Sequence, residues 1–318
     1  MLYPMKFRPI LKSLIWGGEK IIPFKGVESD QKMVGESWEI SGIAGDESVV
    51  ANGELSGRTI TELLEQYGAE LIGAANYERF GNEFPLLIKF IDANEALSIQ
   101  VHPDDELAGE RHNSKGKTEM WYVVDSAEGA RLRSGFAKKV TPEEYVKSVE
   151  GNYVTDILQE YEVQKGDLFF LPAGRIHSIG AGCFIAEIQQ TSNITYRIYD
   201  FNRTDAEGNT RELHTEQAVD AIDYSIEADY RTNYDRETKD KEIEMVQCNY
   251  FNTSFLNLTK PFAINYSNLD SFVIMICVEG EALINGISLK RGETILLPAT
   301  TIRVDINCTS CKIISTRI

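Results

Sequence analysis

The chain has 318 residues, 42% of them hydrophobic, which is enough for two ordinary domains or one large β domain with a sizeable core. Its formal net charge of −17 argues against nucleic acid or an anionic membrane as a partner, because both would be repelled over most of the surface. An anionic small substrate would therefore need a pocket that is locally cationic.

Targeting and membrane insertion are not expected. The first residues contain two prolines and no continuous apolar stretch, so we expect no signal peptide. The longest apolar run, 272–278, is far too short to cross a bilayer. Five cysteines, an odd number, fit a reducing compartment better than a disulfide framework. We therefore expect a cytoplasmic protein, whose oligomeric state the sequence leaves open.

Secondary structure is predicted to be mainly β. Runs rich in Val, Ile, Phe and Tyr alternate at short intervals with glycine and proline, as is typical of many short strands. The clearest predicted strands, in chain order, cover residues 36–41, 84–91, 168–171 and 183–189. Helical patterns are local, at 59–67, at 141–149 with a capping box at its start, and at 211–222.

A strongly charged stretch, 223–244, predicts an exposed connection and separates two similar segments. The first, 166–177, reads GDLFFLPAGRIH, and the second begins GETILLPATT at residue 292. Both have a glycine turn, an apolar strand and a Pro-Ala stop at the same spacing. We therefore interpret the chain as two copies of one β fold, in domains that cover 1–240 and 241–318.

Most residues that could bind a metal lie between positions 97 and 124. Gln100 and His102 are two apart, so on a strand their side chains point to the same face. Glu119 begins a second strand-like run, and a polar loop joins the two runs. Neighbouring strands therefore offer three side chains to one cation.

Segment 166–177 also matches a motif of the cupin family, with a glycine, a proline, a glycine and a histidine at fixed spacing: Gly166, Pro172, Gly174 and His177. The earlier cupin motif carries histidine-x-histidine and a glutamate, and Gln100, His102 and Glu119 take that place here. The chain thus resembles a protein of two cupin barrels, of the jelly-roll type, with a few short helices. The second copy has Thr300, Thr301 and Arg303 instead of the glycine and histidine, so we expect no metal there.

The cupin resemblance adds His177 to the other three residues and so implies a four-ligand site. Each residue alone is more often a hydrogen-bonded core group, but the four at this spacing favour a metal. Two imidazole nitrogens and two oxygens suit zinc, and a single carboxylate leaves the ion a net positive charge. Gln100 replaces a typical cupin histidine, which weakens the case for a redox metal. We predict one Zn²⁺ per chain.

Several longer runs resemble type I mannose-6-phosphate isomerase in its short bacterial form. They span residues 8–215 in the expected order and read IWGG, GESWEI, LLIKFIDA, SIQVHPDD, GKTEMWY and TYRIYD. The resemblance implies a zinc-dependent interconversion of mannose 6-phosphate and fructose 6-phosphate, with a phosphorylated hexose as the partner. Aldose–ketose isomerisation transfers a proton between C2 and C1, which requires stabilisation of the enediolate oxygen.

Three residues are predicted to carry the catalysis. Arg197 would act as a second cationic stabiliser, and Lys117, two residues before Glu119, would hold substrate oxygens or phosphate. The resemblance assigns the general base to Glu187, on the strand between His177 and Arg197. A metal-bound hydroxide could serve instead, or Glu187 could simply pair with a cation, and the sequence does not choose.

Other residues are weaker predictions for the sugar pocket. Trp16 and Trp38 could form its wall or belong to the core. Ser98 could bind the phosphate, and Arg203 could lie at the mouth of the pocket. Asp104 and Asp105 are expected to cap a turn rather than bind metal. The two remaining histidines, His112 and His214, are expected at the surface or in packing.

Two other functions stay open at this point. A non-catalytic sensor could keep the sugar-phosphate pocket and bind its ligand without turnover, although an intact Glu187 and Arg197 argue against it. An isomerase of another phosphosugar, such as glucose 6-phosphate, would have the same ligand set. Turnover of C2 epimers would separate the latter from the leading hypothesis.

Overall fold

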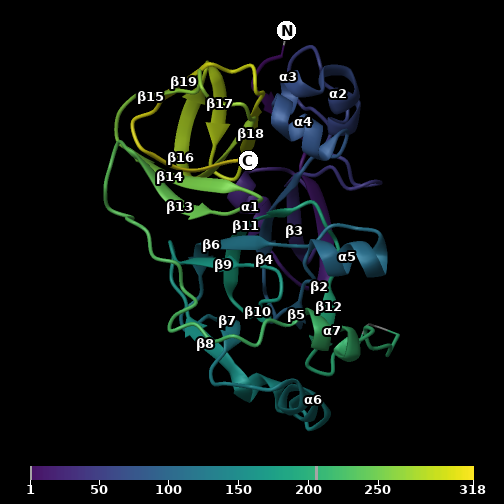
Figure 1. Cartoon of the computed structure of the whole chain (residues 1–318). Coiled ribbons are helices and arrows are strands. Elements are labelled where there is room, and N and C mark those ends of the chain that lie inside the picture. The colour runs from purple at the N-terminus through teal and green to yellow at the C-terminus, as the bar shows by residue number, and fades with distance from the viewer. Residues whose placement is uncertain (1, 205–206) are drawn as a thin grey trace.

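The computed structural model describes residues 2–204 and 207–318, and these residues form three antiparallel sheets (Figure 1). A six-stranded sheet has the order β2(Ile10–Gly18), β3(Val34–Ile40), β4(Leu86–Asp92), β11(Cys183–Gln190), β6(Glu119–Ser126), β9(Leu168–Leu171). A five-stranded sheet has the order β12(Tyr196–Tyr199), β5(Ile99–Val101), β10(His177–Ile179), β7(Arg131–Phe136), β8(Leu158–Glu162). The predicted mainly β fold is confirmed.

The third sheet has nine strands and is built from the end of the chain plus its first strand. Its members are β1(Met5–Lys6), β13(Glu242–Gln247), β14(Asn252–Leu258), β15(Phe262–Asn265), β16(Val273–Ile284), β17(Ile287–Lys290), β18(Thr294–Leu297), β19(Arg303–Asn307) and β20(Cys311–Arg317). Met5 on β1 pairs with Leu296 on β18. The start of the chain therefore completes the sheet that its last residues form.

The six-stranded sheet is buried on both faces. One face, with Met120 and Tyr122, packs into a core that includes Phe255 and Ile274 of the nine-stranded sheet. The other face, with Trp121, shares a core with residues from the five-stranded sheet. Strands covered on both faces need apolar residues at nearly every position, which explains the nearly continuous apolar run of β4. A charged residue on such a strand is buried too, so it needs a partner that offsets the cost of removing its charge from water.

The helices are short and mostly lie at the edges of the sheets (Figure 1). They are α1(Ile21–Lys25), α2(Ile60–Tyr67), α3(Ala69–Ile72), α4(Ala74–Phe80), α5(Asp105–His112), α6(Pro142–Glu150) and α7(Thr215–Ala221), with a 3₁₀ turn at Val154–Ile157. The capping box predicted at Thr141 is present, with Glu144 as its partner. None of the described helices is long and apolar enough to span a membrane.

One local prediction was wrong, and a second holds for all but one residue. The polar loop expected after His102 is helix α5, whose N-cap is Asp104, because the Asp104 carboxylate accepts a hydrogen bond from Leu107 N. The connection 223–244 is not fully exposed, because the Tyr230 ring is buried against Gly135 and strand β13 begins at Glu242. Tertiary packing of one tyrosine decided the second case, which local charge composition could not show.

Candidate metal centre and substrate cavity

Strand register on the five-stranded sheet brings three predicted site residues into one row. On β10, His177 lies directly opposite Gln100 of β5, and Gln100 lies opposite Arg197 of β12. Side chains of directly paired residues point to the same face of a sheet. A histidine, an amide and a guanidinium from distant parts of the sequence therefore share one face.

The six-stranded sheet supplies a second row. Glu187 on β11 lies between Lys89 of β4 and Trp121 of β6 in direct register, and two residues further along β11 Gln189 lies opposite Glu119. Because alternate residues share a face, Glu119, Trp121 and Glu187 all point away from the core that contains Met120. The two rows come from separate sheets.

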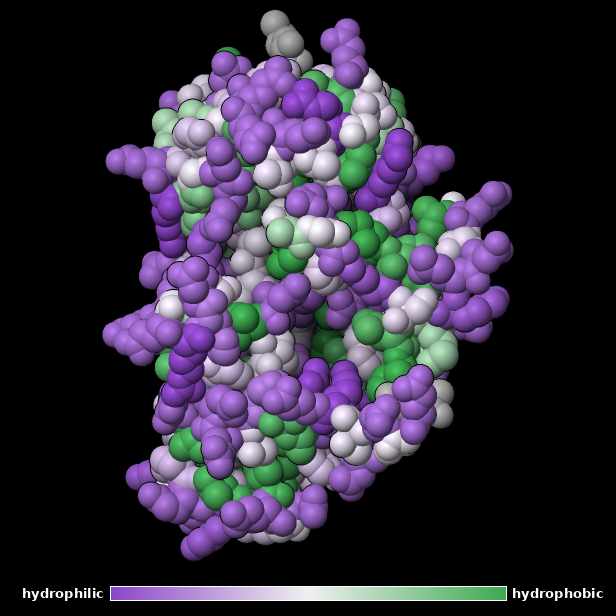
Figure 2. Space-filling model, turned by 90° about the vertical axis from the view of Figure 1, so that its right-hand side faces the viewer, coloured by the Kyte–Doolittle hydropathy of each residue, from purple (hydrophilic) through white to green (hydrophobic). Residues whose placement is uncertain are grey.

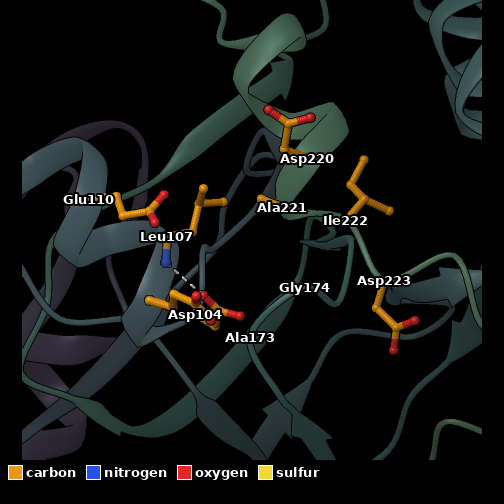
Figure 3. A pocket seen from close by; sticks show the side chains of 10 residues that line it. Asp104, Leu107, Glu110, Ala173, Gly174, Asp220, Ala221, Ile222 and Asp223 are labelled. Atoms are coloured by element: carbon orange, nitrogen blue, oxygen red, sulfur yellow. Dashed lines mark hydrogen bonds between the residues drawn. The ribbon is translucent and has the colours of Figure 1, made fainter.

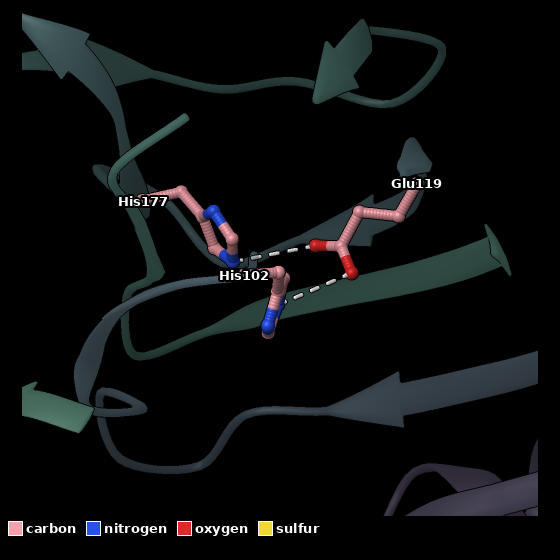
Figure 4. A group of neighbouring side chains, drawn as sticks. All are labelled: His102, Glu119 and His177. Atoms are coloured by element: carbon pink, nitrogen blue, oxygen red, sulfur yellow. Dashed lines mark ion pairs between the residues drawn. The ribbon is translucent and has the colours of Figure 1, made fainter. Parts of the chain in front are cut away.

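Three potential metal ligands meet between these rows (Figure 4). His177 Nε2 lies 3.3 Å from Glu119 Oε1, and His102 Nε2 lies 3.5 Å from Glu119 Oε2. One ligand atom from each of the three lies within 4.8 Å of the others, and all three side chains are buried. This spacing is compatible with a single shared cation.

Hydrogen bonds to the backbone orient both imidazoles. His102 Nδ1 lies 2.9 Å from Ile194 O, and His177 Nδ1 lies 2.7 Å from Arg175 O, so each Nδ1 carries a proton and donates it. Each ring therefore turns a bare Nε2 lone pair toward Glu119. Burial keeps the rings neutral, lowering the pKa of His177 to about 3 and that of His102 well below its ordinary value.

These acceptor atoms fit a metal ion. Within the described part of the chain, His102 Nε2 and both Glu119 oxygens are buried without a hydrogen-bond partner. Burial raises the pKa of Glu119 to about 7, because the charged carboxylate loses its water. Buried acceptors that face one another are costly unless positive charge lies among them, and the Lys117 ammonium, 3.2 Å from Glu119 Oε2, reaches only one edge of the group.

Gln100 lies beside this group, with its Nε2 3.3 Å from His177 Nε2. The amide nitrogen and oxygen of a glutamine exchange places when the side-chain amide is turned over. With the amide turned over, Gln100 Oε1 would take the place of Nε2 beside His177 Nε2. All four predicted ligands are therefore brought together by the structure.

A cavity of about 190 Å³ opens above the ligand group and includes Gln100 in its lining. Its other polar and aromatic lining residues are Trp16, Glu36, Trp38, Lys89, Ser98, Lys117, Glu187, Asn193, Thr195, Arg197 and Arg211. Four of these are cations, on a chain whose net charge is −17. The cavity therefore provides the locally cationic pocket that an anionic substrate requires.

Glu187 is held by two side chains. Trp121 Nε1 donates to Glu187 Oε2 over 2.8 Å, and Lys89 Nζ lies 3.3 Å from Glu187 Oε1. Burial alone would raise the pKa of Glu187, but the cations Lys89 and Lys117 outweigh it and the pKa is lowered. Glu187 is therefore an ionised carboxylate at neutral pH, at the wall of the cavity.

Arg197 and Lys117 approach from the other sides. Lys117 Nζ lies 3.2 Å from Glu119 Oε2, so it reaches the ligand group itself. Arg197 Nη1 donates to Glu212 O over 3.0 Å, while its buried Nε has no hydrogen-bond partner among the described residues. Burial lowers the pKa of Arg197. The Arg197 side chain thus lines the cavity while only one of its guanidinium nitrogens has a protein partner given by these contacts.

The pocket residues differ in part from the sequence predictions. Trp16, Trp38 and Ser98 line the cavity, whereas Arg203 is outside its lining and pairs with Asp200. Asp200 also binds Arg211, which does line the cavity. Sequence reasoning gave no role to Arg211, which carries no local signal. It also missed Lys89, although a lysine within the otherwise apolar run of β4 is a local signal of function.

A second, larger cavity of about 400 Å³ lies apart from the ligand group, between α5 and the end of α7 (Figure 3). Figure 3 shows carboxylates around it, and its acidic lining residues are Asp104, Glu106, Glu110, Asp220 and Asp223. Such a pocket repels a phosphorylated sugar. Figure 2 shows the face of the molecule that is on the right in Figure 1, with a hollow near its middle that has hydrophobic residues at depth and hydrophilic residues around it.

The fold and the site together define a class: a mainly β protein of the cupin type with a buried set of potential metal ligands below a cationic cavity. Comparison with known sequences agrees. Residues 5–129 match the family described as phosphomannose isomerase type I, catalytic domain, and residues 241–318 match mannose-6-phosphate isomerase, cupin domain.

Individual relatives give the same answer. Mannose-6-phosphate isomerase ManA of Bacillus subtilis is 35% identical over 301 residues, which cover 93% of each chain. Mannose-6-phosphate isomerase of Streptococcus mutans is 38% identical over 226 residues, 70% of this chain and 68% of that one. The crystal structure of the Bacillus subtilis mannose 6-phosphate isomerase superposes with a TM-score of 0.88 at 32% identity and covers 99% of both chains. The chain therefore belongs to the type I mannose-6-phosphate isomerase family, and it is an enzyme of the isomerase class.

Proposed function

We propose that this protein interconverts mannose 6-phosphate and fructose 6-phosphate, with one zinc ion per chain held by Gln100, His102, Glu119 and His177. One observation carries the proposal: a buried histidine–carboxylate–histidine group, whose His102 Nε2 has no hydrogen-bond partner among the described residues, lies beside a cavity lined by four cations. The names of the relatives provide the substrate.

Neutral imidazoles and a carboxylate suit zinc, as does the neutral amide oxygen of Gln100. When bound, the ion supplies Lewis-acid stabilisation of the negative charge that develops on the substrate oxygens at C1 and C2. Lys117, which already lies 3.2 Å from Glu119, adds a positive charge at the same place. An oxyanion would therefore be stabilised from two sides.

Glu187 is proposed as the group that takes the proton from C2 and returns it to C1. Its lowered pKa keeps it ionised, and Trp121 and Lys89 fix both of its oxygens. The carboxylate must be able to take up a proton during the reaction, so the surrounding cations set how readily it does so. Glu36 offsets them in part, because it lies 3.8 Å from Lys89.

The substrate is proposed to be held by the cations and aromatic residues of the cavity. Arg197 and Arg211 supply two guanidinium groups to the lining. Ser98 adds a hydroxyl, and Trp16 and Trp38 offer flat apolar surfaces to the sugar carbons. This division leaves the phosphate to the arginines and the reacting carbons to Glu187.

Metal content measured together with activity tests the proposal. The purified protein should contain about one zinc per chain and convert mannose 6-phosphate in a coupled assay. Chelation should abolish the activity, and added zinc should restore it. A zinc-loaded protein that leaves both sugar phosphates unchanged would contradict the proposal. Faster turnover of glucose 6-phosphate would identify that phosphosugar as the substrate instead.

The cellular compartment is proposed from the cysteines. All five are free thiols, and Cys183, Cys277 and Cys311 are buried. Unpaired thiols are typical of a reducing compartment, so we propose that the protein works in the cytoplasm. Fractionation of cells that produce the protein would test this.

A further inference from the structure

The backbone of Arg197 is held by a single histidine, His214, through two hydrogen bonds. The N–H of Arg197 donates to His214 Nδ1 over 3.2 Å, and the N–H of His214 donates to Arg197 O over 2.7 Å. Two residues before His214, the carbonyl of Glu212 accepts from the Arg197 guanidinium over 3.0 Å. The segment 212–214 thus binds Arg197 at its backbone and at its side chain.

This arrangement requires one tautomer of the His214 ring. Because Nδ1 accepts a hydrogen bond, it carries no proton, and a neutral ring then has its proton on Nε2. Glu212 Oε2 lies 3.9 Å from that Nε2, where a carboxylate favours an N–H. His102 and His177 have the opposite tautomer, since their Nδ1 atoms face backbone carbonyls.

The ring of His214 is also fixed in place. It packs against the buried Tyr196 ring, with 6.2 Å between ring centroids. The Tyr196 hydroxyl in turn forms a hydrogen bond with His112 Nε2 over 2.8 Å. Neighbouring residues thus hold the His214 ring where its Nδ1 meets Arg197. Packing alone, however, would not require a nitrogen at this position.

We propose that His214 is a positioning residue for the isomerisation, which rests on the proposed function: its Nδ1 holds strand β12 in the position from which Arg197 lines the cavity. Sequence reasoning expected His214 at the surface or in packing. The acceptor nitrogen beside the backbone of Arg197 gives it a more specific role.

Three substitutions separate acceptor from packing. The Oδ1 of His214→Asn can take the place of Nδ1, whereas the longer His214→Gln places its amide nearer the position of Nε2, and His214→Phe keeps a ring without an acceptor. We expect kcat to fall about tenfold in His214→Phe and His214→Gln, as for loss of one hydrogen bond. We expect His214→Asn to stay within about threefold of the wild type, by the same relation.

Zinc content and KM complete the measurement. Zinc per chain should equal that of the wild type in all three variants, because His214 is not in the ligand group, and kcat should change more than KM. His112→Phe is the matched control, since it removes a histidine from the same cluster without touching Arg197, and we expect near wild-type kcat. Equal loss in His214→Asn and His214→Phe, or no loss in any variant, would overturn the proposal.

The tautomer can be measured without activity. The chain has four histidines, so long-range ¹H–¹⁵N correlation spectra of the zinc-loaded wild-type protein can assign each ring. We expect a proton on Nε2 of His214, and a proton on Nδ1 instead would overturn the proposal even if the variants misfold. If the wild type turned over neither sugar phosphate, the proposed function would fail, while this spectrum would still decide the hydrogen bond.

Discussion

The two glycine–proline segments of this protein, 166–177 and 292–303, have similar backbone features and differ in chemistry. Gly166 N donates to Val123 O over 2.8 Å, and Gly292 N donates to Cys277 O over the same distance. Both glycines have a positive φ, 88° and 80°. Each segment contains one short strand after its glycine: β9 pairs with β6, and β18 pairs with β16. The two segments are therefore alike in their glycine turns and in the strand pairing that follows each turn.

The strand register locates the differences. Glu119 pairs with Leu171, five residues after Gly166, and the equivalent pair in the second copy is Val273 with Leu297. His177 is buried, whereas Arg303, eleven residues after Gly292 as His177 is after Gly166, is exposed and pairs with Asp305. An apolar residue and a surface arginine thus stand where the first segment has Glu119 and His177, two of the four proposed ligands.

The substitution with the largest expected effect tests whether the two segments differ in metal binding. His177→Ala removes a ligand from the buried group, so zinc content should fall far below one per chain and activity should fall to background. Arg303→Ala, at the equivalent position, should keep both zinc and activity. Metal analysis and the coupled assay on the two variants check this. Metal loss in both, or in neither, would contradict the comparison.

Glu187→Gln should separate proton transfer from metal binding. The amide cannot take up a proton from C2, so kcat should fall by about 10²- to 10⁴-fold, the usual contribution of a general base. Zinc content should stay unchanged. Incorporation of deuterium from D₂O into C1 or C2 should stop, and unchanged incorporation would move the role to another base.

The second copy provides the control for Glu187. Trp121 pairs with Glu187 on β11, and the equivalent residue, Met275, pairs with Ser315 on β20. Ser315→Ala removes a buried hydroxyl from the same strand position. We expect it to leave the deuterium exchange as it is, because Ser315 is far from any of the proposed chemistry in the sheet order.

Arg197→Ala should keep zinc and lose most of kcat, since Arg197 lines the cavity but is not a ligand. Removal of a donor that stabilises the transition state typically costs about 10²- to 10³-fold. Arg131→Ala, on the exposed part of β7, is the matched arginine control and should retain activity. If Arg197→Ala and His177→Ala lost zinc equally, the proposed division of tasks would be refuted.

The smallest expected effects are on stability. Gly166→Ala places an alanine at a positive φ, where its Cβ would make only ordinary contacts, the nearest 3.4 Å from Arg236 Nη1, so it should cost about 1 kcal/mol. Gly292→Ala should cost more, about 2 kcal/mol, because its Cβ would lie 2.9 Å from Lys25 Cα. Denaturant unfolding of both variants measures the difference, and an equal cost would show that the Lys25 backbone gives way.

Sequence reasoning identified more of the scaffold than of the cavity. Strands β3, β4, β9 and β11 were predicted close to their observed bounds, because apolar runs between glycine and proline are a local signal. Helix α5 was missed, because its sequence is polar throughout and Asp104 looked like a turn residue. The division into domains at 240 and the absence of metal from the second copy stay predictions.

By itself the sequence determined the mainly β class and the family, and it predicts the ligand types and the two copies, since all of these depend on residue identity and spacing along the chain. Only the tertiary structure decided that Arg211, rather than Arg203, lines the cavity and that His214 holds Arg197. Such contacts join residues whose positions in the chain carry no shared pattern. They depend on strand register and side-chain packing, where a shift of one residue turns a side chain to the opposite face.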